Sequence, residues 1–213
     1  MRKLVGILSV FIALNASANY PQVEIKTSEG NILIELYPDK APKTVDNFLI
    51  YVKNDFYKGT IFHRTINRFV IQGGGYNPDL KPKETLPPIP SEANNGLTNE
   101  MGMLAMARAY DPNSATSQFF INVDRNRFLN HHKPHPDYYG YTVFGKVIQG
   151  MDVVQKISAI PTTTAGPFFQ DVPVKNVIIE DVMVIPEKGE ATPPPEKVKS
   201  KVKSNKNKRM KKR

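Results

Sequence analysis

The chain of 213 residues contains no cysteine. Disulfide bridges, thiolate nucleophiles, thiolate metal sites and lipid-modified cysteines are therefore excluded for this sequence. The absence leaves the redox compartment open, because a chain without cysteine folds in an oxidising or a reducing environment. A hydrophobic content of 40% with 23% charged residues is typical of a soluble globular protein.

The sequence also lacks a hydrophobic run long enough to cross a membrane. Its longest run spans residues 4–14, whereas a spanning helix needs about 20 apolar residues. The run follows the basic start Met1-Arg2-Lys3 and precedes the small residues at 16–18, which is the layout of a cleaved secretory signal. We therefore expect a signal peptide at residues 1–18 and an exported protein, periplasmic or secreted. The alternatives are a buried first strand or an uncleaved anchor.

The expected folded part has no excess of either charge. The chain carries a net charge of +9, but residues 187–213 hold 11 basic and 3 acidic residues, whereas residues 19–186 hold 16 and 17. We therefore expect no nucleic-acid surface on the folded domain at 19–186.

The segment at 187–213 is rich in Pro, Glu, Thr and Lys and cannot bury a core, so we predict a disordered Lys/Arg-rich tail. Such a tail contacts an anionic membrane surface or acidic partners, or it serves only as a solubilising extension. A nuclear-targeting role conflicts with the signal at the other end.

Short β-rich segments broken by turns dominate residues 19–186. We expect strands at 23–26, 32–36, 60–64, 69–72, 103–107, 119–122, 142–147 and 176–184, and helices at 42–52 and 150–157. Without a regular alternation of strands and helices, the pattern favours an all-β fold, either a closed or a sandwiched antiparallel sheet. The Pro-rich stretch at 76–99 is expected to be a surface loop.

One arginine stands in an unusual setting. Residues 62–75 read FHRTINRFVIQGGG, and on a strand Phe62, Arg64 and Ile66 share one face. An arginine among apolar neighbours is costly unless it is paired or has a function, so a structural salt bridge and a functional role are both open. The three glycines are not a phosphate-binding loop, because the GxGxxG spacing and a following Lys-Ser/Thr are missing.

Several motifs occur in a fixed order: FHR and FVIQGG within 62–74, MAR at 106–108, SQFFI at 117–121, FL at 128–129 and VFGKV at 143–147. Together they resemble the cyclophilin family of peptidyl-prolyl isomerases, its bacterial exported branch, over about residues 23–185. The resemblance implies a closed eight-stranded antiparallel β-barrel capped by two α-helices. It also implies a peptidyl-prolyl cis-trans isomerase that assists the folding of exported proteins and acts on proline-containing unfolded or flexible polypeptides.

The resemblance assigns site residues by position. Arg64, Phe69 and Gln72 are the implied catalytic residues, with Phe69 also part of the apolar pocket for the proline ring. The implied substrate-binding residues are His63, Val70, Ala107, Arg108, Ala109, Gln118, Phe120, Phe128, Leu129 and Tyr141. Phe128 stands where many eukaryotic members have Trp, so we expect weak binding of cyclosporin, and Tyr141 stands where they have His.

These residue types suit a rotation about the peptide bond. The barrier of about 18–20 kcal/mol comes from resonance, and no bond is made or broken, so no cofactor or metal is required. An arginine can donate a hydrogen bond to the nitrogen lone pair that appears in the twisted state. The alternative is a binding module that holds proline-containing chains in the same groove with turnover incidental. We expect a monomer.

The loop at 130–137 reads NHHKPHPD and is the one candidate metal site. Three His and one Asp are suitable ligands for a transition metal. Two prolines in an exposed loop favour plain turn chemistry instead, so we predict no metal.

Overall fold

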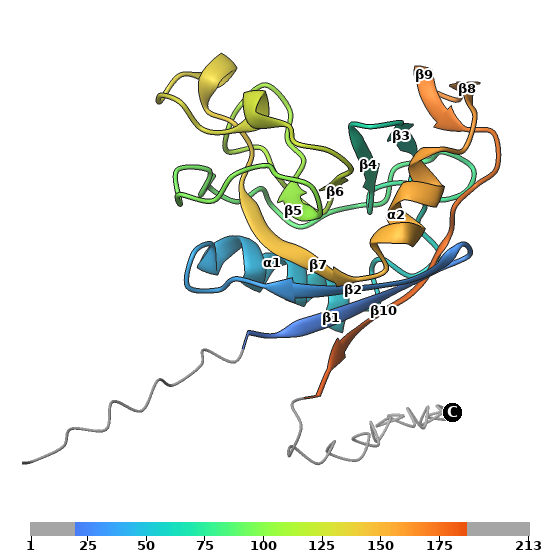
Figure 1. Ribbon diagram of the computed structural model, residues 1–213, viewed down its shortest axis with the longest axis horizontal. Helices are drawn as coiled ribbons and strands as arrows, with labels where there is room; N and C mark the ends of the chain where they lie inside the picture. Colours follow the sequence, from blue (N-terminus) through green and yellow to red (C-terminus); the bar gives the residue numbers. More distant parts are fainter. Residues whose placement is uncertain (1–19, 187–213) are drawn as a thin grey trace, which may run out of the picture.

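The computed structural model describes residues 20–186. The signal peptide expected at 1–18 and the tail expected at 187–213 lie outside the described residues and stay predictions. The described part is mainly β, with two α-helices and two short 3₁₀ helices (Figure 1).

The strands of the domain are β1 (Gln22–Thr27), β2 (Gly30–Leu36), β3 (Arg64–Ile66), β4 (Val70–Gly73), β5 (Met103–Met106), β6 (Phe119–Asn122), β7 (Val143–Gln149), β8 (Thr162–Ala165), β9 (Phe168–Pro173) and β10 (Ile179–Ile185). Its helices are α1 (Pro42–Lys53), η1 (Arg127–Leu129), η2 (Pro136–Tyr138) and α2 (Met151–Ser158).

Eight of the strands form one curled antiparallel sheet in the order β10-β1-β2-β7-β5-β6-β4-β3. The sheet is open, with β10 and β3 at its edges, so the closed barrel expected from the sequence is not confirmed. The segment before β3 pairs with the start of β10 and the residues just before it, because Phe62 N donates to Val177 O and Ile179 N donates to Thr60 O. The free edge of β3 is instead flanked by β9, which belongs to a separate two-stranded sheet with β8.

Most elements fall where the sequence predicts them. Both helices and the hairpin of β1 and β2 are confirmed, as are the strands around 103–107, 119–122 and 142–147. The segment at 60–64 differs: its first four residues form only an isolated bridge, and the strand begins at Arg64. The hairpin of β8 and β9 was not predicted.

Helix α1 covers one end of the curled sheet. Pro42 occupies its first turn, where a missing N–H leaves no hydrogen bond unmade. The apolar stripe at 3, 4 and 7 spacing faces inward, so Val45, Phe48 and Val52 are buried in the main core. Helix α2 packs against the other end of the sheet, on β2, β3 and β4.

The long loop at 76–99 supplies the cap of α1. Glu92 accepts hydrogen bonds from the backbone N–H of Lys43 at 3.1 Å and of Thr44 at 2.9 Å. The Thr44 hydroxyl also donates to Glu92, at 2.7 Å. A carboxylate at this end of the helix satisfies free N–H groups and opposes the positive end of the helix dipole. The loop is therefore tied to the domain through α1.

Strand β6 is buried along its whole length. Its residues alternate between faces, so Phe119 and Ile121 enter the main core while Phe120 points to the other side. There Phe120 joins Val70, Ala105 and Val143 in a second, smaller apolar cluster. Two members of this second cluster, Val70 and Phe120, line the cavity described below.

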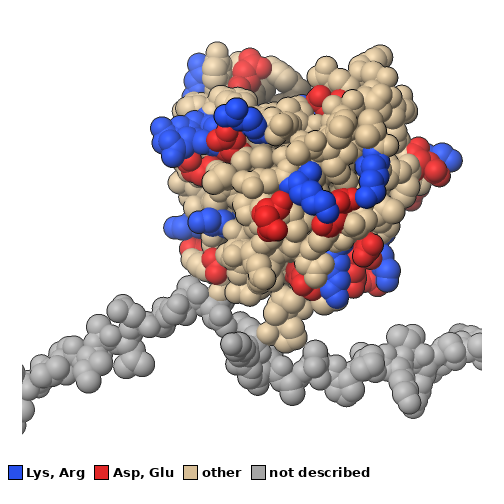
Figure 2. Space-filling view, turned by 45° about the vertical axis from the view of Figure 1, so that its right-hand side comes forward, with Lys and Arg blue, Asp and Glu red and all other residues tan. Residues whose placement is uncertain are grey.

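Charged side chains of both signs are interspersed on the face of the domain in Figure 2. That distribution agrees with the near balance of basic and acidic residues at 19–186. Within residues 20–186, no helix combines the length and apolarity needed to cross a membrane.

Candidate active site

The strand register places the predicted site residues in one row across the sheet. Arg64 on β3 is opposite Gln72 on β4, Gln72 is opposite Phe120 on β6, and Phe120 is opposite Ala105 on β5. Directly opposite residues share a face of the sheet. The row therefore carries a guanidinium, an amide and an aromatic ring side by side on the outer face, away from the main core.

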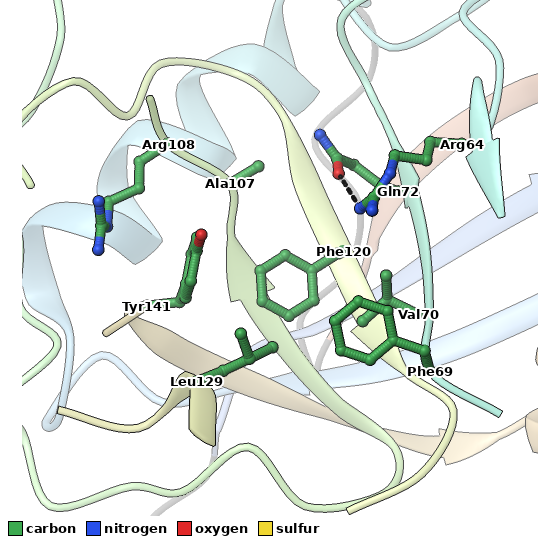
Figure 3. A pocket seen from close by; sticks show the side chains of 9 residues that line it. All are labelled: Arg64, Phe69, Val70, Gln72, Ala107, Arg108, Phe120, Leu129 and Tyr141. Atoms are coloured by element: carbon green, nitrogen blue, oxygen red, sulfur yellow. Dashed lines mark hydrogen bonds between the residues drawn. The ribbon is translucent and has the colours of Figure 1, made fainter. Parts of the chain in front are cut away.

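A cavity of about 280 Å³ opens over this row (Figure 3). All nine residues that line it were implied by the sequence: Arg64, Phe69, Val70, Gln72, Ala107, Arg108, Phe120, Leu129 and Tyr141. They come from strands β3, β4 and β6, from the turn before β4, from the segment that follows β5, and from the segment between β6 and β7 that contains η1. Residues up to 77 positions apart in the chain thus meet in one cleft, although the cavity alone does not fix each residue's role.

The apolar half of the cavity is built around Phe120. Its ring meets Tyr141 edge-on, with centroids 5.5 Å apart and planes at 81°. Phe69 and Leu129 pack against the same cluster, and Val70 and Phe120 are almost fully buried. A rigid apolar recess beside polar groups is the usual form of a small-molecule or side-chain binding site.

The polar half is a chain of hydrogen bonds that starts at Arg64. Arg64 Nη1 donates to Gln72 Oε1 at 3.5 Å, and Gln72 Nε2 donates to Gln118 Oε1 at 3.0 Å. On its other edge, Arg64 Nε lies 3.4 Å from Asp171 Oδ2. Arg64 therefore has an ion pair and also a place on the cavity wall, so the salt bridge considered from the sequence is present and the functional role stays a prediction.

Arg108 is held by four backbone carbonyls. Its guanidinium donates to Gly140 at 2.8 Å, Ala109 at 2.9 Å, Tyr110 at 3.0 Å and Pro136 at 3.1 Å. It also lies over the ring of Tyr141, 4.7 Å from the centroid, an attractive cation–π contact. Arg108 thereby fixes the loop at 130–140 and the ring of Tyr141, one wall of the cavity.

A second hollow of about 300 Å³ continues the cleft past Gln72. It shares Gln72, Ala107 and Arg108 with the first cavity, so the two form one groove. Its other lining residues are Ala109, Ser114, Thr116 and Gln118. Ala109 and Gln118 were predicted, whereas Ser114 and Thr116 were not, because single hydroxyl residues in a loop carry no distinctive pattern.

Two predicted residues lie away from the cavity. His63 is 2% exposed and packs between Tyr76 at 4.6 Å and Phe168 at 5.3 Å between ring centroids. It precedes the strand, which begins at Arg64; Phe62 lies in the main core while Arg64 lines the cavity, so the shared face expected for these two residues is not found. Phe128 does not line the cavity either; it stacks on Phe69 at 5.6 Å and is 69% exposed.

Burial also changes the protonation of His63. Removal from water is the largest cause that lowers its pKa, and the adjacent charge of Arg64 lowers it too, while the Ile61 carbonyl opposes this in part; together they bring the pKa to about 4. Among the described residues, its Nδ1 has no hydrogen-bond partner. His63 is therefore a neutral packing residue near neutral pH, and it does not line the cavity.

The histidine-rich loop at 130–137 shows turn contacts. His131 Nδ1 is 2.8 Å from the carbonyl of Tyr139, and His135 Nδ1 accepts a hydrogen bond from the backbone of Asp137. Within residues 20–186, no group of three His, Cys, Asp or Glu side chains is placed to hold a metal ion.

Asp171, the ion-pair partner of Arg64, is a further residue that the sequence reasoning missed. It lies on β9, in the hairpin that was not predicted. A signal was present: three Thr at 162–164, then Gly166-Pro167, then two Phe at 168–169 form two strand-like runs around a turn. That pattern predicts a hairpin, although it does not indicate that the hairpin reaches Arg64.

The chain is similar in sequence to a known protein family and to several of its members. Residues 22–184 match the family described as "Cyclophilin type peptidyl-prolyl cis-trans isomerase/CLD". The chain is 54% identical over 186 residues to a peptidyl-prolyl cis-trans isomerase of Acinetobacter baylyi, covering 86% of this chain and 96% of that one. It is also 54% identical over 162 residues to peptidyl-prolyl cis-trans isomerase B of Escherichia coli, covering 76% and 98%.

A solved structure with a similar fold is a cyclophilin type peptidyl-prolyl cis-trans isomerase of Cryptosporidium parvum, crystallised in the presence of the dipeptide Ala-Pro. It matches with a TM-score of 0.66 and 30% identity, over 78% of this chain and 99% of that one.

Proposed function

The chain belongs to the cyclophilin-type peptidyl-prolyl cis-trans isomerases, and from this premise we propose how its residues carry the isomerisation and where it acts. The enzyme has to bind the twisted X-Pro bond more tightly than either planar isomer, because only that difference lowers the barrier. The observation that carries the proposal is the row of Arg64, Gln72 and Phe120 along the cavity floor.

Arg64 is proposed to stabilise the twisted state. When the bond leaves planarity, the proline nitrogen loses conjugation and gains a lone pair that can accept a hydrogen bond. Two edges of the guanidinium are engaged by Gln72 and Asp171, and the side chain lines the cavity. A guanidinium keeps its proton at any working pH and holds its donors in a rigid plane, so it is oriented before substrate arrives.

The apolar half of the cavity is proposed to hold the proline ring. Phe120, Phe69 and Leu129 offer an apolar recess beside the guanidinium, with Tyr141 as a further wall. Fixing the ring lets the carbonyl on the other side of the bond rotate. The recess also excludes water, which would weaken the hydrogen bond from Arg64.

The second hollow is proposed to hold the polypeptide before the proline. Gln72 and Gln118 are joined by a hydrogen bond, and both line this part of the groove, where they can orient substrate carbonyls. The substrates are then proline-containing unfolded or flexible polypeptides. The Cryptosporidium relative crystallised with Ala-Pro supports this class of ligand.

The mechanism is tested on the mature protein with a chromogenic peptide that contains one X-Pro bond. We expect Arg64→Ala to lower kcat/KM about 100-fold, the range seen when one hydrogen-bond donor to a developing charge is removed. Arg64→Lys keeps the charge but not the planar donors and should retain more activity. Arg125→Ala, an exposed arginine outside the cavity, is the matched control and should stay within twofold of wild type. Activity of Arg64→Ala within twofold of wild type contradicts the mechanism.

We further propose that the enzyme assists folding of exported proteins in the periplasm. Support comes from the sequence of residues 1–18, which has the layout of a secretory signal. Spontaneous X-Pro isomerisation takes tens to hundreds of seconds, slow enough to limit folding after export. Cell fractionation and sequencing of the mature amino terminus test this: a protein retained in the cytoplasm with residues 1–18 intact contradicts it.

A further inference from the structure

The hairpin of β8 and β9 stands beside the free edge of β3 (Figure 1). It is anchored at both ends of β9. The ring of Phe168 packs edge-on against Tyr76 with centroids 5.0 Å apart, and it also contacts His63. At the other end Val172 is 3% exposed. The segment between these two anchors is therefore fixed in place beside Arg64.

That segment is a β-bulge. Thr163 is opposite Val172 and Ala165 is opposite Phe168, so the three residues 169–171 face the single residue Thr164. Extra residues in one strand turn side chains out of the regular alternation, and bulges often serve this purpose beside active sites. Asp171 also has a φ of +68°, a conformation that non-glycine residues seldom adopt.

The bulge turns one of its three side chains inward. Phe169 is 92% exposed and Gln170 is exposed, whereas the side chain of Asp171 is only 18% exposed and its Oδ2 lies 3.4 Å from Arg64 Nε. The backbone of Asp171 is strained and directs a carboxylate at one arginine. Unfavourable backbone conformations of this kind persist mainly at functional sites.

Arg64 needs such a partner. Its side chain is 35% exposed, and a long side chain in that setting samples many rotamers unless contacts restrict it. Gln72 holds the guanidinium by Nη1 and Asp171 lies at Nε, so the two contacts fall on different atoms of one plane. Two contacts fix the orientation of a plane better than one does.

We propose that Asp171 is a positioning residue: it holds the Arg64 guanidinium in the plane from which it donates to the twisted proline nitrogen. The inference rests on the role of Arg64 proposed above. Asp171 does not line the cavity and acts on the substrate only through Arg64.

Two substitutions distinguish the effect of the Asp171 carboxylate from the effect of the positive φ at this position. Asp171→Gly removes the acceptor and adopts positive φ without strain, and Asp171→Asn keeps an acceptor oxygen and tolerates that φ. In the chromogenic peptide assay we expect Asp171→Gly to lower kcat about threefold with little change in KM. The reason is that the hydrogen bond from Arg64 to the proline nitrogen forms only in the twisted state. At 1.36 kcal/mol per tenfold, that loss is about 0.65 kcal/mol, within the range of exposed ion pairs. Asp171→Asn should stay within about 1.5-fold, and Thr164→Ala, on the opposing strand, is the matched control.

Coupling to Arg64 is the decisive readout. In an Arg64→Ala background, Asp171→Gly should cause no further loss, because a residue that acts through another is not additive with it. In wild type and Asp171→Asn, NMR relaxation of the Arg64 Nε–H group should report an ordered side chain, and in Asp171→Gly a mobile one. The melting temperature of Asp171→Gly should move by only about 3 °C or less.

Each outcome has one meaning. Any of four results overturns the positioning role. Two concern Asp171→Gly alone: a kcat equal to that of wild type, or an unchanged order of the Arg64 Nε–H group. The other two are a loss of kcat on Asp171→Gly that is equal with and without Arg64, and a loss of kcat in Asp171→Asn as large as in Asp171→Gly. If Arg64→Ala itself retains activity within twofold, the proposed mechanism fails instead. The two failures are therefore distinguishable in one set of variants.

Discussion

Buried His63 makes the stability of the domain depend on pH in a defined window. Burial lowers its pKa from 6.5 to about 4, with Arg64 adding to the shift. Between these two values the unfolded chain binds a proton that the folded protein does not, so the free energy of unfolding falls as pH falls from about 6.5 to 4. Above 6.5 both states are neutral at this residue and the effect is absent.

The size of the loss follows from the shift. With pKa values of 6.5 unfolded and about 4 folded, linkage gives a loss of about 2 kcal/mol between pH 7 and pH 5, and about 3 kcal/mol when the full window is crossed. At pH 5 most carboxylates are still ionised, because their ordinary pKa values lie near 4. A comparison of pH 7 with pH 5 therefore isolates the histidine from general acid unfolding.

The variant that tests this pH dependence is His63→Phe, which keeps an aromatic ring between Tyr76 and Phe168 but cannot take up a proton. Urea unfolding at pH 7 and pH 5 should show a loss for wild type that exceeds the loss for His63→Phe by about 2 kcal/mol. His132→Gln, which replaces an exposed histidine, is the control and should behave as wild type. Equal losses in wild type and His63→Phe would refute the assignment of this pH dependence to His63.

Three further predictions follow from the fold and the groove. Glu92→Ala should lower the free energy of unfolding by about 1–2 kcal/mol in urea titrations, because it removes the carboxylate at the start of α1, whereas exposed Glu84→Ala should change it by less than about 0.5 kcal/mol. Gly75→Ala should lower kcat/KM in the peptide assay with little loss of stability, because the added Cβ lies 2.5 Å from the flexible Gln118 side chain and displaces it; unchanged kcat/KM contradicts this role for Gln118. Cyclosporin should inhibit the enzyme weakly and Phe128→Trp more strongly, since an indole N–H supplies a donor that phenylalanine lacks; potent inhibition of the wild type contradicts the expectation.

The lining of the cavity could be predicted because its residues sit in short motifs within regular strands. Arg64, Gln72 and Phe120 come from the segments whose motifs carry the family resemblance, and antiparallel pairing then sets them in one row. The resemblance places His63 beside the site. In the structure it packs between Tyr76 and Phe168 just before the strand begins, and these contacts with distant segments cannot be predicted from its position in the motif.

Contacts between distant segments could not be predicted in the same way. Asp171 is 107 positions from Arg64, and no periodicity relates a hairpin at 162–173 to the edge of β3. Whether eight strands close into a barrel depends on hydrogen bonds at two edges, and here β3 is short and its free edge meets β9 instead of β10. Composition and strand count do not contain that information.

Strand β6 has consequences for how this protein can change over evolutionary time. Because both of its faces are buried, a substitution at Phe119 or Ile121 disturbs the core directly behind the cavity, and one at Phe120 disturbs the cavity floor. The strand therefore has no neutral side on which mutations can accumulate. The exposed bulge at 169–170 has no such constraint. We expect lineages of this enzyme to keep β6 nearly fixed and to vary at the exposed positions of the hairpin beside β3.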